Sequence, residues 1–99
     1  MVIGVLTVDL LLGDVRSLKQ KRAVVRPLVA ELRRRFEVAA AETGALDLHR
    51  RAELAVAVVT STHGHASDVL DGCERLVAAR PELELLSARR RVLDDDDLD

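Results

Sequence analysis

Two segments of this 99-residue chain are apolar on both alternating sets of residues, and they constrain the fold more than any other feature. Val2–Leu12 and Arg51–Thr60 are rich in Val, Leu and Ala, and each has the length of a β-strand. A strand that is apolar on both faces is usually central in its sheet and covered on both sides. The sequence therefore predicts a sheet with these two strands at its centre.

Two segments with helical periodicity follow these strands. After the N-cap candidate Ser17, the apolar residues of Leu18–Phe36 fall on one arc of roughly 100° on a helical wheel. Pro27 lies opposite that arc, so it either bends the helix on its solvent side or begins a separate second helix. The other helical segment is capped by Ser61 or Thr62 and ends at Arg80-Pro81.

The remaining segments complete the order β-α-β-β-α-β. Glu37–Glu42 is predicted as a weak edge strand, although it also fits a continuation of the helix, and Glu82–Val92 is predicted as the last strand. The acidic tail Asp94–Asp99 is expected to be disordered. The prediction is an α+β fold, a ferredoxin-like βαββαβ sandwich in one domain over residues 1–93. It has a four-stranded antiparallel sheet with two helices on one face.

Two helices cover only one face of such a sheet, which leaves the other face of the central strands open. That face would expose an apolar patch of several hundred Å². We therefore expect a homodimer that buries the open sheet face. The alternative is a monomer in which long side chains and the tail shield the patch.

Charge is distributed unevenly along the chain. Of the 17 acidic residues, five lie in the tail, so the rest of the chain carries 15 basic and 12 acidic residues. Ser17–Phe36 contains seven basic residues and only one acidic residue, Glu31. The basic residues of this segment are Lys19, Lys21, Arg22, Arg26, Arg33, Arg34 and Arg35. The predicted first helix is therefore the most basic part of the protein.

Four of these basic residues form a row on the predicted helix. Lys19, Arg22, Arg26 and Arg33 lie within about 60° on a wheel with 100° per residue. Guanidinium groups one turn apart suit successive phosphates, because each offers paired N–H donors. We predict contact with RNA or a ribosomal particle, made by Lys19, Lys21, Arg22, Arg26, Arg33 and Arg34. The plainer interpretation is the solvated face of an amphipathic helix, and a rival function is a homodimeric module that binds a protein or small ligand without nucleic acid.

Several chemistries are disfavoured by residues that the chain lacks. Phe36 is the only aromatic residue, so the central strands offer no rings for the base stacking used by RRM-type sheets. There is no GxxG loop for KH-type binding. Acylphosphatases share the predicted topology but need an Asn, and this chain has none. We expect a protein that is not an enzyme.

No metal or cofactor is expected either. His63, His65, His49 and Cys73 are the candidate ligands, but they show no second ligand pair, and Cys73 falls on the apolar stripe of its helix. The single cysteine excludes an intramolecular disulfide and suits a reducing compartment. No signal peptide or membrane span is evident, so a cytoplasmic location is expected.

The segment Ser17–Arg22 reads Ser-Leu-Lys-Gln-Lys-Arg and resembles the S-L-K-x-K-R signature of the YlxP-like family, small bacterial proteins with a domain of unknown function. The resemblance covers about residues 1–93. Its later blocks are Leu32–Phe36, Asp47–Ala52, Val56–Val59 and the start of the second helix near His65. It implies a ferredoxin-like fold and a link to ribosomes or RNA, since the family's genes often neighbour those of translation and ribosome-maturation factors. It offers no catalytic residues.

Overall fold

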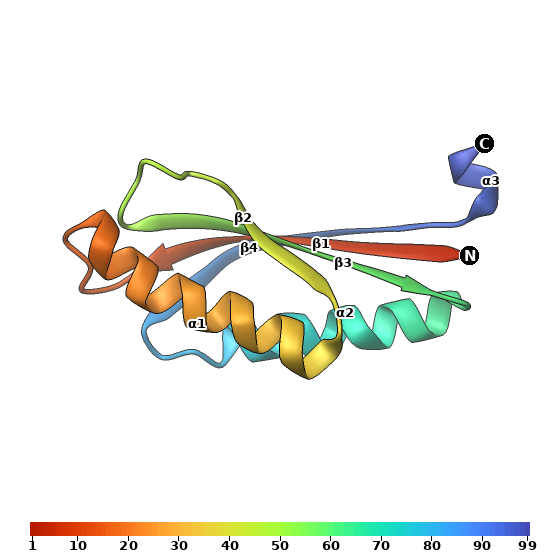
Figure 1. Cartoon of the computed structure of the whole chain (residues 1–99), viewed down its shortest axis with the longest axis horizontal. Coiled ribbons are helices and arrows are strands. Elements are labelled where there is room, and N and C mark those ends of the chain that lie inside the picture. The colour runs from red at the N-terminus through yellow and green to blue at the C-terminus, as the bar shows by residue number, and fades with distance from the viewer.

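A computed structural model describes all 99 residues and contains one four-stranded antiparallel sheet with α1 and α2 on the same side of it (Figure 1). The strand order is β2-β3-β1-β4, which confirms the predicted ferredoxin-like α+β fold. The elements are β1 (Val2–Leu12), α1 (Leu18–Phe36), β2 (Ala39–Gly44), β3 (Arg51–Thr60), α2 (His63–Ala78), β4 (Leu83–Leu93) and α3 (Asp95–Leu98).

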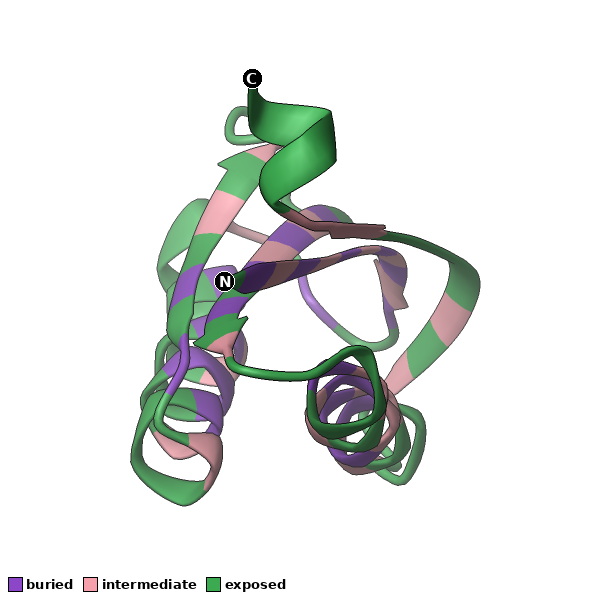
Figure 2. Cartoon of the chain, turned by 90° about the vertical axis from the view of Figure 1, so that its right-hand side faces the viewer, coloured by how far each residue is buried: buried purple, intermediate pink, exposed green.

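The central pair of strands is β1 and β3, as their apolar composition predicts. They pair in antiparallel register from Val2 opposite Thr60 to Leu11 opposite Arg51. Even-numbered residues of β1 are buried beneath the helices, and odd-numbered residues are only partly buried, so burial alternates along the strand (Figure 2). Within one chain the helices therefore cover a single face of the central strands.

The first helix, α1, is continuous from end to end. The Ser17 hydroxyl accepts a 3.1 Å hydrogen bond from the Gln20 N–H, so Ser17 is the predicted N-cap. Pro27 lies inside the helix and is exposed, which settles the open alternative in favour of one helix. The apolar side chains that α1 buries are Val25, Leu28, Val29 and Leu32.

The second helix, α2, packs closely against the end of α1. Thr62 is its N-cap, and its hydroxyl accepts a hydrogen bond from the His65 N–H at 3.1 Å. Gly72 is buried against the Phe36 ring, because a Cβ atom at this position would lie 2.5 Å from Phe36 Cε1. The missing side chain of Gly72 therefore makes room for the only aromatic ring in the protein.

The edge strand β2 begins two residues later than predicted. Glu37 adopts a left-handed conformation with φ of 53°, and its N–H donates to the Arg33 carbonyl oxygen at 3.1 Å. This residue thus closes α1, and the chain becomes extended only afterwards. The other edge strand, β4, differs from its predicted bounds by one residue at each end.

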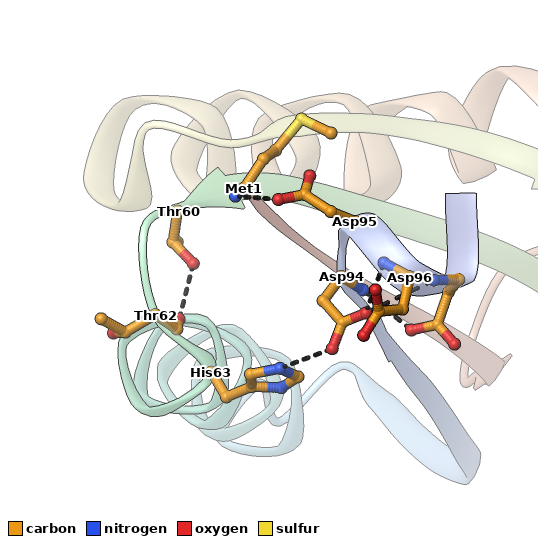
Figure 3. Close-up of polar contacts among 8 residues, drawn as sticks. Met1, Thr60, Thr62, His63, Asp94, Asp95 and Asp96 are labelled. Carbon is orange, nitrogen blue, oxygen red and sulfur yellow. Dashed lines mark hydrogen bonds and ion pairs between the residues drawn. The ribbon is translucent and has the colours of Figure 1, made fainter. Parts of the chain in front are cut away.

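The acidic tail differs from the expectation of disorder, because it forms the helical turn α3. The Asp94 carboxylate accepts backbone hydrogen bonds from Asp96 and Asp97, and the Asp97 side chain accepts one from the Asp94 N–H. Composition alone did not reveal this capping box. Figure 3 shows two further contacts, from the Met1 amino group to Asp95 and from His63 to Asp94.

Candidate nucleic-acid interface

Three cations lie exposed along one flank of α1 without an ion-pair or hydrogen-bond partner: Lys19, Arg22 and Arg26. Their spacing corresponds to about 4.5 Å and 6 Å of rise along the helix. With Arg33 they form a row that we call the basic ridge. The wheel analysis predicted these four residues on one flank.

Arg33 fixes the position of the basic ridge relative to the sheet. Its Nε and Nη2 atoms donate to the Ala40 carbonyl oxygen at 3.0 and 2.6 Å. Ala40 belongs to the edge strand β2, so the ridge runs along the outer side of the molecule, away from α2. Arg33 remains exposed but is already engaged with the protein backbone.

Lys21 does not belong to the surface, so its predicted contact with nucleic acid is wrong. Its side chain is 2% exposed, and its Nζ lies 2.6 Å from Glu42 Oε2. It also donates to the carbonyl oxygens of Ala45 at 2.8 Å and Leu48 at 2.7 Å. Two of the N–H donors of the ammonium group thus bond to carbonyl oxygens, and the Glu42 carboxylate supplies the opposite charge. Lys21 therefore ties α1 to the loop between β2 and β3.

The wheel already contained a signal for this burial. Lys21 falls between Leu28 and Leu32, inside the apolar arc and about 100° away from Arg22. A single lysine within an apolar stripe is typically buried with partners or carries its charge to the rim. Lys21 is buried with partners because the carbonyl groups of the β2–β3 loop, distant in the sequence, lie close to its ammonium group.

The remaining basic residues of α1 lie off the ridge. Arg34 is exposed and turned about 100° from Arg33. Arg35 lies 3.8 Å from Glu31 and 5.8 Å from the centre of the Phe36 ring. Glu31 also pairs with Arg80, two residues after the end of α2. Glu31, the only acidic residue of α1, thus pairs with arginines on the side of α2, and it does not neutralise the cations of the basic ridge.

A second group of arginines lies on β4, where the sequence reasoning had assigned no site. Arg90 points to the helix side and donates to Asp71 at 2.8 Å and Glu74 at 3.0 Å. These hydrogen bonds raise the pKa of Arg90 above its ordinary value. The pairing attaches β4 to α2, so Arg90 is structural.

The neighbouring arginines face the open side of the sheet. Arg89 contacts Asp9 at 3.4 Å and Glu53 at 3.3 Å, and the Ser87 hydroxyl donates to Asp9 at 2.6 Å. Arg91 is exposed and forms no ion pair. Strand alternation was the signal for these positions, because every second residue of an edge strand shares a face.

The candidate metal ligands are scattered in the structure. His63 Nε2 lies 3.3 Å from the Asp94 carboxylate, and His65 and His49 are exposed. Cys73 is buried on α2, and desolvation raises the pKa of its thiol to about 11. No group of three His, Cys, Asp or Glu side chains is arranged to hold a metal ion. None of the helices is long and apolar enough to span a membrane.

An apolar hollow lies on the open face of the sheet. It has a volume of about 300 Å³ and is lined mainly by alanines, with Arg33 at its rim. The alanines are Ala39, Ala40 and Ala41 of β2 and Ala55 and Ala57 of β3. Ala40 is buried toward the helices, but the short side chains of the other four alanines make this half of the face low, whereas Arg89 and Arg91 project from the half formed by β4.

Comparison with known proteins agrees with this architecture and with the resemblance in the α1 signature. The uncharacterized protein YlxP of Bacillus subtilis (strain 168) is 28% identical over 82 residues, which cover 83% of this chain and 89% of that protein. A family model described as "Protein of unknown function (DUF503)" matches residues 3–90. Because that match spans all four strands up to Arg90, both long helices and the basic ridge, the chain belongs to the DUF503 family.

Proposed function

We propose that this protein binds RNA, including RNA exposed on a ribosomal particle, through the basic ridge of α1. The observation that carries the proposal is the row of Lys19, Arg22 and Arg26, three exposed cations without an acidic partner. Unpaired cations in a row are suited to phosphates, which neutralise them without any loss of existing ion pairs. With such a partner, the location that we propose for the protein is the cytoplasm.

Rigidity supports this assignment. α1 is held at its first turns by Lys21, which anchors the β2–β3 loop, and near its last turn by Arg33, which binds β2. The ridge is therefore attached to the sheet at both ends, and binding costs little ordering of the backbone. Arg22 and Arg26 can engage phosphates while Arg33 keeps its backbone contact.

The mode of binding is electrostatic. Phe36 is half-buried against Gly72, so no aromatic ring is free for base stacking. Contacts to phosphates alone carry no sequence information and are weakened by salt. About three contacts to a single strand give a log–log salt slope near −2, which is about a 40-fold loss of affinity between about 50 and 300 mM salt.

A second candidate function is supported by the apolar hollow on the open face. A hollow lined by Ala39, Ala55 and Ala57 suits an apolar partner or ligand instead of a phosphate chain. Binding at that face persists at high salt, because apolar contacts are not screened. Salt dependence therefore distinguishes the two candidates.

The test compares two charge-reversed variants of equal net charge. Arg22→Glu/Arg26→Glu alters the ridge, and Arg51→Glu/Arg75→Glu reverses two exposed arginines outside α1. Binding to a labelled RNA hairpin is measured by fluorescence anisotropy, and association with ribosomal particles by co-sedimentation, at about 50 and 300 mM salt. The ridge variant is expected to lose at least about tenfold in affinity, and the control at most about threefold.

Three results would count against the proposal. They are equal losses in both variants, binding that persists at high salt, and no binding by the wild-type protein at low salt. Circular dichroism spectra of both variants establish that each is folded.

A further inference from the structure

The face of the sheet opposite α1 and α2 is divided into a projecting half and a low half. On β4, Arg89 and Arg91 lie opposite Thr7 and Val5 of β1 and therefore share the open side. On the other half, β2 and β3 present four alanines to that side. We call these four, Ala39, Ala41, Ala55 and Ala57, the alanine floor.

This face also carries exposed apolar side chains near the first residues of β1. Val59 is 68% exposed and lies opposite Ile3, which is itself only half-buried. Val5 and Ala57 form the next pair along the strands. Figures 1 and 2 show that both long helices lie on the other side of the sheet, and that only the short turn α3 projects on the open side, at the end of β4, so neither α1 nor α2 covers these residues.

We propose that a second copy of this chain covers the open face, related by a two-fold axis parallel to the strands. Rotation about that axis places β4 of each copy over β2 of the other, so the same contact forms at both sides of the dimer. The Arg91 stem then lies over Ala39 of the partner, and the alanine floor receives the projecting half. A two-fold axis across the strands would instead place β4 of each copy over β4 of the other, so that the projecting halves would meet each other.

Charge favours the same arrangement. Arg91 has no ion-pair partner within its own chain. Glu37, two residues before Ala39, is exposed and has no cationic partner. An arginine lying over Ala39 of the partner extends toward this carboxylate, so two unpaired charges of opposite sign meet at each side of the dimer.

The available area suits a second copy. Four strands about 4.8 Å apart and about 30 Å long present on the order of 600 Å² per copy, close to the lower range of specific interfaces. The two halves of the face complement each other only through a two-fold axis, so the same patch serves both copies. This inference does not depend on RNA binding, because the basic ridges remain on the outer sides of the dimer.

Oligomeric state gives the first test. Sedimentation equilibrium is expected to show a mass near twice the 10.9 kDa of one chain. Ala57→Arg, which places a charge in the floor, is expected to sediment as a monomer. The matched control Ala78→Arg, on the exposed side of α2, is expected to remain dimeric. The proposal is overturned if the wild type is still a monomer at about millimolar concentration, where even weak interfaces form. It is also overturned if Ala57→Arg remains a dimer.

Orientation gives the second test, with a short bis-maleimide cross-linker and two variants that each gain one surface cysteine. An equimolar mixture of Arg91→Cys and Ala39→Cys is expected to form a cross-linked heterodimer, and Arg91→Cys alone is expected to form little or none. The native Cys73 is buried and does not compete. Efficient cross-linking of Arg91→Cys by itself, or none in the mixture, overturns the orientation. A folded monomeric variant that still binds RNA shows that a failure here leaves the ridge proposal intact.

Discussion

Lys21 on α1 lies 2.6 Å from the Glu42 carboxylate on β2, and this ion pair lies where α1, β2 and the following loop meet. The Glu42 oxygen that takes part is buried and has no other polar partner. Two loop carbonyl oxygens also depend on the same ammonium group. Lys21 therefore has a structural role, whereas Lys19, the other lysine of α1, is exposed at the surface.

We expect Lys21→Met to lower the free energy of unfolding by about 2–4 kcal/mol, because Glu42 loses its counter-ion and two carbonyl groups lose their donor. Urea unfolding followed by circular dichroism measures the change. Glu42→Gln, which keeps an acceptor for Lys21, is expected to cost less. In Lys21→Met/Glu42→Leu the unpaired charge is gone, so part of the stability returns. A Lys21→Met variant as stable as the wild type would contradict this role.

Two glycines of α2 are expected to respond to alanine in opposite directions. At Gly72 a methyl group meets the Phe36 ring, so Gly72→Ala is expected to destabilise by about 1–3 kcal/mol. At Gly64 an added Cβ atom would meet nothing within 4 Å outside its own stretch of helix, so Gly64→Ala is expected to stabilise by about 0.5–1 kcal/mol. Thermal unfolding of both variants checks the pair. Equal shifts in Tm of the same sign would show that the contact with Phe36 is not decisive.

The turn α3 is expected to be lost in acid. Desolvation raises the pKa of Asp94, but hydrogen bonds from the backbone of Asp97 and Asp96 and from His63 together lower it below its ordinary value of 3.8. Because the folded-state pKa is lowered, the stabilisation is present above about pH 4 and is lost as the pH falls through the lowered value.

Amide chemical shifts of Asp96 and Asp97 measure this transition. The amides of Gln20 and His65 are the internal control, because each is bound by a hydroxyl group that does not titrate in this range. Identical titration of all four amides would indicate global unfolding instead of loss of the cap.

Cys73 is expected to be nearly inert in the folded protein. Burial raises the pKa of its thiol to about 11, so only about one molecule in a thousand carries a thiolate at pH 8. Alkylation by iodoacetamide, followed by mass spectrometry, is expected to be slow in buffer and fast in concentrated urea. A native rate equal to that in urea would place the thiol at the surface.

Much of the fold could be predicted because its signals are local. The two-sided apolar composition of Val2–Leu12 and Arg51–Thr60 indicated the central strands, and both were found with those bounds. Ser17 was predicted as a cap from its place before an apolar period, and it caps α1. These features depend on side chains within one or two helical turns or on strand alternation, which a sequence displays directly.

Elements without a strong periodic signal were predicted less well. The start of β2 was displaced because Glu37, a residue without any preference for the left-handed conformation, closes α1 there. The tail was expected to be disordered from its charge. It instead gains a capping box, a contact with His63 and a contact with Met1, residues far away in the chain.

The candidate interface shows the same difference between local features, which the sequence predicts, and long-range contacts, which it does not. By itself the sequence determined that α1 is basic and that Lys19, Arg22, Arg26 and Arg33 share one flank, because helical geometry alone sets those directions. Only the tertiary structure decided that Lys21 is buried, since its carbonyl partners lie 24 and 27 residues away and come together when the β2–β3 loop packs on α1. Tertiary structure also decided which half of the open face projects, because strand order, not composition, places the arginines of β4 across the sheet from the alanines of β2. The periodicity of a helix or strand can be read from the sequence, but which residues are neighbours across a sheet is set only when the strands have paired.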